Sequence, residues 1–423
     1  MKLKTIRNFF IIAALVVVSF GIGYQLGVKE VGGRGEILQS IIERSTNQKK
    51  EVNLSLFWDV WDRLNRYYID KKALDPQKMI YGAISGMVAS LGDPYTVFLP
   101  PEQNKEAKDD LSGKFEGIGA QLGVKEKKIV VIAPLKDSPA EKAGIRAGDW
   151  ITKVEGKETV NWTLYEAVSK IRGPKGSTVT LTILHKDAAS PAEIKVTRET
   201  INVVAVSWDL KNVKCSNNTI LQCKIIKEDC NDCQKIAYLK LDRFGDQTSS
   251  EWNKAVDGIF QAMKQSAPEG LVFDLRNNPG GYLTGSVFIA SEFLKNGPVV
   301  IQESATGGRQ TYEVNRPGRL LEIPMVVLIN KGSASASEIV AGVLKERQRA
   351  KIVGETSFGK GSIQEAQDLP EGAGIHITTY KWLLPSGKWI NSSGVEPDIK
   401  VENNDAKPEE DLQLEKAIEI LVK

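Results

Sequence analysis

Residues 325–346 read MVVLINKGSASASEIVAGVLKE, and this stretch decides the fold of the second half of the chain. A buried strand is expected at 325–329, where all five residues are apolar, and a helix at 335–346. Between them Ser333, Ser335 and Ser337 alternate with alanine. A tight turn there can expose a hydroxyl group, and the free N–H groups and dipole of a helix start favour developing negative charge. Serines that only cap the helix are the alternative interpretation.

Strands and helices alternate around this segment. Further apolar runs of strand length lie at 236–241 and 270–275, and helices are expected at 249–265, 282–293 and 408–423. This alternation is typical of an α/β layer.

A glycine-flanked lysine follows the serine segment in IVGETSFGKGSIQ, residues 352–364. Lys360 comes 25 positions after Ser335, and Gln364 follows four residues later. A lysine with the ordinary pKa of about 10.4 is protonated at neutral pH and cannot accept a proton from serine. Burial without a carboxylate partner lowers that pKa, and the neighbours Phe358 and Ile363 with the neutral Gln364 predict such a setting.

Three more motifs complete a family pattern: DLRNNPGG at 274–281, LPSG at 384–387 and GVEPD at 394–398. Together with the serine and lysine segments they resemble the carboxyl-terminal processing peptidases, also called tail-specific proteases. The resemblance implies a serine endopeptidase with a crotonase-like α/β core and no cofactor. Within the first motif, Asp274 and Arg276 are interpreted as a structural ion pair at a strand end.

The resemblance also assigns roles to individual residues. Ser335 is implied to be the nucleophile and Lys360 its general base, with Gln364 orienting Lys360 by a hydrogen bond. The oxyanion hole is implied to combine the backbone N–H of Ala336 with that of Gly280 or Gly281, of which we favour Gly281.

The segment 112–200 has the texture of a separate small domain. Strands are expected at 128–134 and 178–184 and a helix at 164–172, around the central sequence GIRAGDWITKVEG. This order of elements resembles a circularly permuted PDZ domain, which implies recognition of protein substrates with apolar C-terminal tails. The residues expected to contact the tail are Gly117, Ile118, Gly119 and Ala120 around its carboxylate, and Leu122 with the helix around its last side chain.

The N-terminus predicts a membrane anchor. Lys2, Lys4 and Arg7 precede an uncharged, largely apolar run at 8–28, which is long enough to cross a bilayer as a helix. The basic flank should stay in the cytoplasm, so the later domains are expected outside it, periplasmic or extracellular. A cleaved signal peptide is the alternative, although no clear small-x-small cleavage site follows the run.

A helical region is expected after the anchor. Apolar residues at three- and four-residue spacing mark a helix face at 57–68, and a second helix is expected from Asp75-Pro76 to about Gly92. We interpret these faces as packing surfaces, with self-association as the second interpretation. The family resemblance makes a homodimer or larger homo-oligomer the expected assembly.

All four cysteines lie in one short insertion: Cys215, Cys223, Cys230 and Cys233. Outside the cytoplasm such a local, even set favours two disulfides, and a structural zinc bound by four thiolates is the alternative. The insertion, at 211–234, is a departure from the family pattern.

The whole chain is therefore expected to be a multidomain α+β and α/β protein. Its expected divisions are 1–29 anchor, 30–111 linker and helices, 112–200 PDZ domain, 201–400 peptidase core with the insertion, and 401–423 C-terminal helix. A net charge of +3 gives no case for nucleic-acid binding, and no residue cluster has catalytic metal spacing.

Other function classes fit the sequence less well. Only two histidines are present, and both His185 and His376 are interpreted as structural or surface residues. A silent PDZ scaffold would need neither Ser335 nor Lys360. A penicillin-binding type of Ser–Lys enzyme would carry lysine three residues after its serine, where this chain has Glu338.

Overall fold

The structure is a computed structural model that describes residues 53–135, 137–162, 164–185, 188–216, 222–226, 230, 232–403 and 410–422. It divides into two compact units, Met1–Ile80 and Tyr81–Lys423. The expected membrane anchor, residues 1–29, lies outside the described residues. Within the described part of the chain, no helix is both long and apolar enough to span a bilayer.

A seven-stranded mixed sheet forms the centre of the larger unit, in the order β11-β10-β12-β13-β16-β17-β20. The strands from β12 to β20 run parallel, whereas β10 pairs antiparallel with both of its neighbours. Their bounds are β10 Val206–Ser216, β11 Gln222–Ile226, β12 Gln234–Leu241, β13 Gly270–Asp274, β16 Met325–Ile329, β17 Lys351–Gly354 and β20 Ile399–Lys400.

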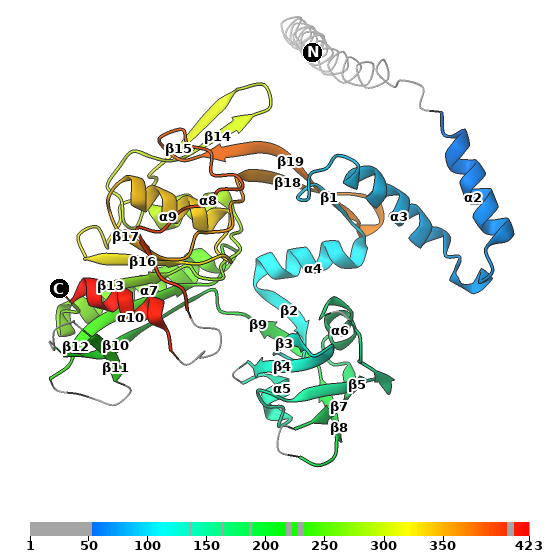
Figure 1. Cartoon of the computed structure of the whole chain (residues 1–423), viewed down its shortest axis with the longest axis horizontal. Helices are drawn as coiled ribbons and strands as arrows, with labels where there is room; N and C mark the ends of the chain where they lie inside the picture. The colour runs from blue at the N-terminus through cyan, green and yellow to red at the C-terminus, as the bar shows by residue number, and fades with distance from the viewer. Residues whose placement is uncertain are drawn as a thin grey trace, which may run out of the picture. The chain divides into compact units, whose positions relative to one another are not determined.

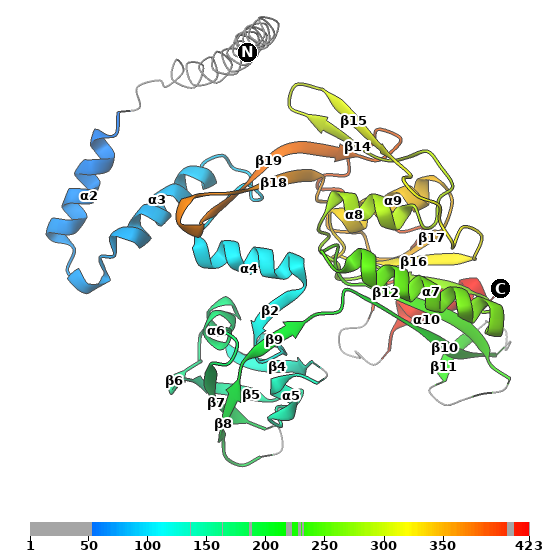
Figure 2. The same ribbon diagram turned by 180° about the vertical axis from the view of Figure 1, so that it is seen from behind.

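Side chains that alternate along the central strands build a separate core on each face of this sheet. In β13, Leu271 and Phe273 join a core with helices α7 (Thr248–Ser266), α8 (Leu283–Ala290) and α9 (Ala336–Glu346), whereas Val272 joins a core with α10 (Leu412–Leu421). Figure 1 shows α10 in front of the sheet, and Figure 2, from behind, shows α7 in front. Helices on both faces explain why these strands are apolar throughout.

A second, five-stranded antiparallel sheet carries the long hairpin that follows the glycine-flanked lysine. Its strands are β1 Val97–Leu99, β14 Pro298–Ser304, β15 Arg309–Glu313, β18 Ser362–Asp368 and β19 Gly374–Leu383. Strand β19 pairs with β1, β14 and β18, and a short 3-10 turn, η2 (Pro370–Gly372), joins β18 to β19.

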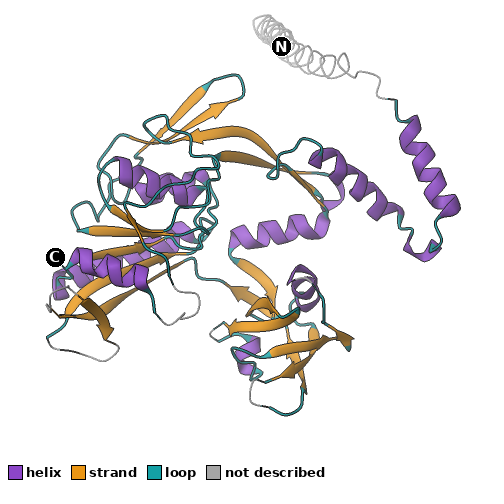
Figure 3. Ribbon diagram, viewed as in Figure 1, coloured by secondary structure: helices purple, strands orange, loops and turns teal. Residues whose placement is uncertain are grey.

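Residues 114–202 form a small β-domain, drawn mainly in orange in Figure 3. Its six-stranded sheet has the order β3-β4-β5-β7-β8 with β6 beside β5, so β3 is an end strand. Strands β2 and β9 pair with each other at its entrance and exit. The bounds are β2 Lys114–Gly117, β3 Ala120–Lys125, β4 Lys128–Pro134, α5 Pro139–Lys142, β5 Trp150–Val154, β6 Lys157–Glu158, α6 Leu164–Ile171, β7 Thr178–Leu184, β8 Ala192–Thr197 and β9 Glu199–Asn202.

The first N-terminal helix carries exposed apolar residues. Helix α2 (Ser55–Tyr67) buries none of its residues, and Leu64 and Tyr67 on the face expected to pack are 41% and 70% exposed, so the packing of this face stays a prediction. Its aromatic rings contact one another along the helix, as in the pair Phe57–Trp61. The remaining N-terminal elements are η1 (Lys71–Ala73), α3 (Pro76–Ala89) and α4 (Pro101–Ser112).

Helix ends also differ from the sequence expectation, whereas several strands match it. Strands β4, β7 and β16 have the expected bounds. The C-terminal helix begins only at Leu412, because the Asp411 side chain accepts the N–H of Leu414 and caps it there.

The four cysteines form two disulfides, Cys215–Cys223 and Cys230–Cys233, which use all the thiols that a zinc site would need. Cys215 and Cys223 stand directly opposite each other on β10 and β11. The first disulfide therefore fixes the register of the hairpin at the edge of the central sheet.

The packing of α10 gives a test on two leucines of one helix. Leu414 is 6% exposed in the core beneath α10 and Leu412 is 37% exposed. Leu414→Ala should lower the free energy of unfolding by about 2–5 kcal/mol through the cavity it leaves. The matched Leu412→Ala should cost under about 1 kcal/mol. Urea unfolding checks both, and equal losses would contradict this packing.

Candidate active site

Ser335 lies at the turn between β16 and α9 in a backbone conformation that L-residues seldom adopt, with φ of 55° and ψ of −115°. Its two neighbouring serines hold this turn. The fully buried Ser333 and Ser337 donate their hydroxyls to the carbonyls of Leu275 and Asn278, each at 2.8 Å. Of the three serines, Ser335 is the one that lines the pocket described below. The hydroxyls of Ser333 and Ser337 therefore stabilise the turn, whereas Ser335 lines the pocket.

Gly280 lies directly against this turn, whereas Gly281 lies against the backbone of Phe244. A Cβ at Gly280 would come within 2.8 Å of the Ser335 Cβ, and a Cβ at Gly281 would come within 2.1 Å of the Phe244 carbonyl oxygen. The N–H of Gly280 donates to Asn278 Oδ1 at 2.9 Å. Gly281, together with Ala336 at the start of α9, lines the pocket. The geometry thus favours Gly281 over Gly280 as a donor facing the pocket.

The backbone around Lys360 is held by two tryptophans. The indole N–H of Trp382 donates to the Lys360 carbonyl at 2.9 Å, and that of Trp389 donates to the Gly361 carbonyl at 2.8 Å. A Cβ at Gly361 would come within 2.5 Å of the Trp389 Nε1, so glycine is required there. Trp382 and Trp389 therefore position the lysine loop.

Ser335 and Lys360 line one pocket of about 440 Å³. Its wall is largely apolar, formed by Leu111, Leu283, Ile339, Ile363 and Trp382. An apolar side chain of a ligand would therefore be accommodated beside the serine.

Burial lowers the pKa of Lys360 below its ordinary value, as the sequence predicted, although the negative charges of Asp93 and Glu338 oppose this. The absence of a carboxylate nearby was therefore a wrong expectation. The Nζ atom lies 4.8 Å from the centre of the Tyr95 ring. Desolvation, with the nearby charges of Glu338 and Asp93, raises the pKa of Tyr95.

Gln364 lines the same pocket, but its amide nitrogen donates to Ser362 Oγ at 2.9 Å and to Thr378 Oγ1 at 3.0 Å. Pairing of β18 with β19 sets Gln364 opposite Thr378, whose hydroxyl takes the amide. Among the described residues no hydrogen bond joins Gln364 to Lys360, so the expected orienting contact is not seen in this structure.

Sequence reasoning missed several residues around the lysine. Asp93, Tyr95 and Glu338 had no assigned role, and His376, interpreted as structural, lines the pocket. Burial and the charge of Lys360 both lower the pKa of His376. Local signals existed only for Glu338, through the Ser-x-x-Glu capping pattern, and for His376, through the alternation of strand β19.

The residues expected to bind a peptide tail are split by the structure. Ala120 and Leu122 lie on the end strand β3, with Gly119 just before it at a φ of 73°. Gly117 lies in β2 and Ile118 is 3% exposed in the domain core. Gly117 and Ile118 can therefore take part in tail binding only through their backbone atoms.

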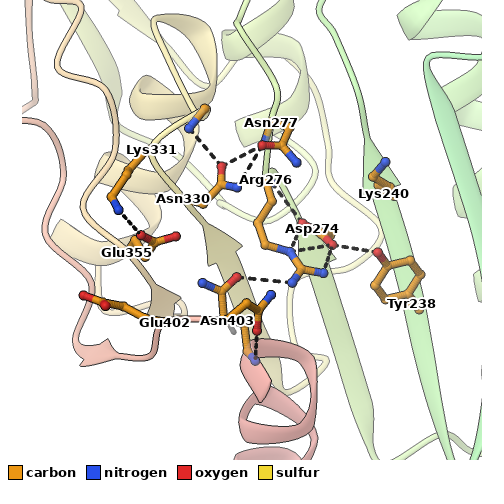
Figure 4. Close-up of a pocket in the computed structure, with 12 residues that line it drawn as sticks. Tyr238, Lys240, Asp274, Arg276, Asn277, Asn330, Lys331, Glu355, Glu402 and Asn403 are labelled. Carbon is orange, nitrogen blue, oxygen red and sulfur yellow. Dashed lines mark hydrogen bonds and ion pairs between the residues drawn. The ribbon is translucent and has the colours of Figure 1, made fainter. Parts of the chain in front are cut away.

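Asp274 and Arg276 form the expected structural ion pair, at 2.6 Å. Figure 4 shows the Arg276 guanidinium facing Asp274, whose carboxylate also accepts the Tyr238 hydroxyl. Arg276 binds Asp411 as well, at 2.7 Å, and so ties β13 to the start of α10. Tyr238, Asp274 and Arg276 line a polar pocket of about 730 Å³, where Lys331 pairs with Glu355 at 2.7 Å.

Three family descriptions match the chain: Peptidase family S41 at residues 235–401, PDZ domain at residues 107–184, and the N-terminal domain of the activating protease CtpB at residues 19–103. A carboxy-terminal-processing protease of Bartonella bacilliformis is 36% identical over 371 residues, covering 86% of this chain and 79% of the relative. The carboxy-terminal processing protease CtpB of Bacillus subtilis is 34% identical over 360 residues, covering 85% and 70%.

Solved structures agree. A photosystem II D1 C-terminal processing protease is similar with a TM-score of 0.50 and 30% identity, covering 82% of this chain and 92% of that one. A putative S41 protease from Bacteroides fragilis has a TM-score of 0.53 at 16% identity, covering 85% and 96%, which is a likeness in fold.

The electrostatics of Lys360 can be tested directly. The Asp93 charge raises the pKa of Lys360, so Asp93→Asn should lower that pKa further. Nuclear magnetic resonance of ¹³C-methylated lysines measures it. Asp368→Asn, which changes an exposed carboxylate at the end of β18, is the matched control and should leave it unchanged. A raised or unaltered pKa in Asp93→Asn would contradict the assignment.

Proposed function

This chain belongs to the carboxy-terminal processing proteases of peptidase family S41, and we propose that Ser335 and Lys360 form its catalytic dyad. It is a serine-type peptidase with a PDZ domain that acts on protein C-termini. The observation that carries this proposal is the single pocket lined by both residues. The half-buried position of Ser335 at a strained turn that lines the pocket and the lowered pKa of Lys360 support it.

In the first step Ser335 Oγ attacks the carbonyl carbon of the peptide bond, and its proton passes to the neutral Nζ of Lys360. Collapse of the tetrahedral intermediate breaks the C–N bond, and Lys360 returns the proton to the leaving amine. Water then hydrolyses the acyl-enzyme ester, with Lys360 again acting as the base. A lowered lysine pKa increases the neutral fraction that both steps require.

The backbone N–H groups of Ala336 and Gly281 stabilise the oxyanion in this proposal. Both residues line the pocket, and the N–H of Gly280 is already given to Asn278. The start of α9 adds the favourable end of the helix dipole. Each such donor contributes about 2.7–4 kcal/mol in comparable hydrolases.

Substrates are proteins with apolar C-terminal tails, taken up by the PDZ domain and cut after a small or medium apolar residue that fits the pocket. A tail would pair with the end strand β3 and place its last side chain against Leu122 and α6. The apolar wall of Leu283, Ile339 and Ile363 supports the preference at the cut. Tail binding would also gate access to Ser335.

We further propose that residues 1–29 anchor the protein in a membrane, with the peptidase and PDZ domains exported. The basic flank and apolar run of the sequence support this orientation, and the two disulfides suit an oxidising compartment. A homo-oligomer is proposed as well, supported by the exposed aromatic residues of α2.

The dyad predicts the behaviour of two variants on an unfolded model protein ending in an apolar tail. Ser335→Ala and Lys360→Ala should each lower kcat/KM by roughly 10⁴-fold or more while remaining folded. Lys264→Ala, on the surface of α7, should leave it unchanged. Activity in either dyad variant would refute the assignment, and inactivity of the wild type would favour a scaffold or partner-activated protein. Labelling of Ser335 by a β-lactam would favour the penicillin-binding alternative.

Tail recognition predicts different kcat/KM values for two substrates that differ only in their C-terminal group, which is a free carboxylate in one and an amide in the other. Amidation of the C-terminal carboxylate should lower kcat/KM by about tenfold or more, which corresponds to about 1.4 kcal/mol. In Leu122→Glu the free acid and the amide should be cut at similar rates, because the tail site is lost. Equal rates for both substrates with the wild type would rule out tail capture by the PDZ domain.

A further inference from the structure

Glu338 is a fully buried carboxylate in the first turn of α9, and it contacts the backbone of both dyad residues. Its Oε2 atom accepts the N–H of Ser335 at 2.8 Å and the N–H of Lys360 at 2.9 Å. We infer that Glu338 is a positioning residue that sets the Ser335 turn and the Lys360 loop at a fixed separation. This inference rests on the Ser–Lys dyad proposed above.

The other oxygen of Glu338 completes the link. Its Oε1 atom accepts the Ser357 hydroxyl and the Gly359 N–H, both at 2.6 Å. The same Ser357 hydroxyl accepts the N–H of Val395 at 2.7 Å. One carboxylate therefore binds four neutral donors, three of which come from the lysine loop.

Helix capping alone does not explain this arrangement. Of the four bonds to the Glu338 side chain, a capping box needs only the one from the N–H of Ser335. Glutamine could supply that bond. It could not accept from all four donors, because one end of its side chain is an NH₂ group that only donates. The donor set is therefore selective for a carboxylate, as is the positive end of the helix dipole.

The charge of Glu338 opposes the chemistry that the dyad needs. Burial lowers the pKa of Lys360, but Glu338 and Asp93 raise it. The other titratable groups facing the amine are Tyr95, from the turn before β1, and His376, from β19. A carboxylate kept at this place against its electrostatic effect is consistent with a geometric role.

Glu338 therefore affects the dyad in two opposing ways: its hydrogen bonds support activity, whereas its charge raises the pKa of Lys360 and so disfavours the neutral amine. A substitution that removes the charge and some of the bonds separates the two effects. In Glu338→Gln, loss of two of the four bonds should lower kcat by about 10²-fold, the size of effect expected from a misplacement of about 1 Å, with KM unchanged. Loss of the charge should lower the pKa of Lys360. Activity requires the neutral amine, so the acidic limb of the kcat profile should move to lower pH.

The experiment measures kcat, KM and their pH profiles on an internally quenched peptide with a free apolar C-terminal residue. Glu292→Gln is the matched control, since Glu292 is also fully buried and binds Trp252, Arg316 and Arg319 in the core rather than the catalytic loops. Its kcat per folded molecule, with folding followed by circular dichroism, should equal that of the wild type.

Lys360→Ala in the same series separates the failure of this inference from the failure of the dyad. If Lys360→Ala is inactive and Glu338→Gln has the wild-type kcat and pH limb per folded molecule, the positioning role is refuted and the dyad stands. If Glu338→Gln loses activity only in proportion to its loss of folded protein, the residue is a helix cap. If Lys360→Ala keeps activity, the dyad and this inference fail together.

Discussion

The proposed catalytic region depends on one constraint, the hydrogen bonding that ties the loop after β13 to the loop after β16. Ser333 and Ser337 give their hydroxyls to Leu275 and Asn278, and the Ala334 N–H also reaches the Asn278 carbonyl. Asn330 adds a second tie, because its side chain accepts the N–H of Asn277. Both loops leave the same edge of the parallel sheet, so the glycines after β13 and the serine after β16 are set side by side without any contact to the peptide. The strained backbone of Ser335 persists because these bonds over-determine it.

The lysine reaches this edge by a different route. It enters from the antiparallel sheet through the loop before β18, and its main chain is fixed from three sides, by Glu338, Trp382 and Trp389. Its amine meets groups from a third element, the turn that carries Asp93 and Tyr95. The pKa of Lys360 is therefore a balance between burial, which lowers it, and carboxylates contributed by separate parts of the fold, which raise it.

The sequence was most informative where local pattern decides structure. Five consecutive apolar residues defined β16 to the residue, and alternation defined β7. Family motifs pointed to Ser335 and Lys360, which the fold brings to one pocket.

Long-range contacts could not be predicted in this way. Asp93 and Tyr95 lie far upstream of Lys360, and three of the four donors to Glu338 follow it by about twenty residues, so no periodicity predicts these contacts. The bond expected between Gln364 and Lys360 is absent from the structure for the same reason, because Thr378, on the neighbouring strand, accepts the amide of Gln364. The crotonase-like assignment of the core and the division into domains stay predictions.

The two tryptophan clamps have a consequence for how such an enzyme is turned on and off. With the carbonyls of Lys360 and Gly361 held by indole N–H groups, the backbone of this loop has little freedom to shift. A change in the distance between the Lys360 amine and the Ser335 hydroxyl then requires rotation about the bonds of the four-carbon lysine side chain. That side chain has several staggered states of similar energy. Resting and active forms of the site would then differ in the torsion angles of the Lys360 side chain, with the carbonyls of Lys360 and Gly361 held in place.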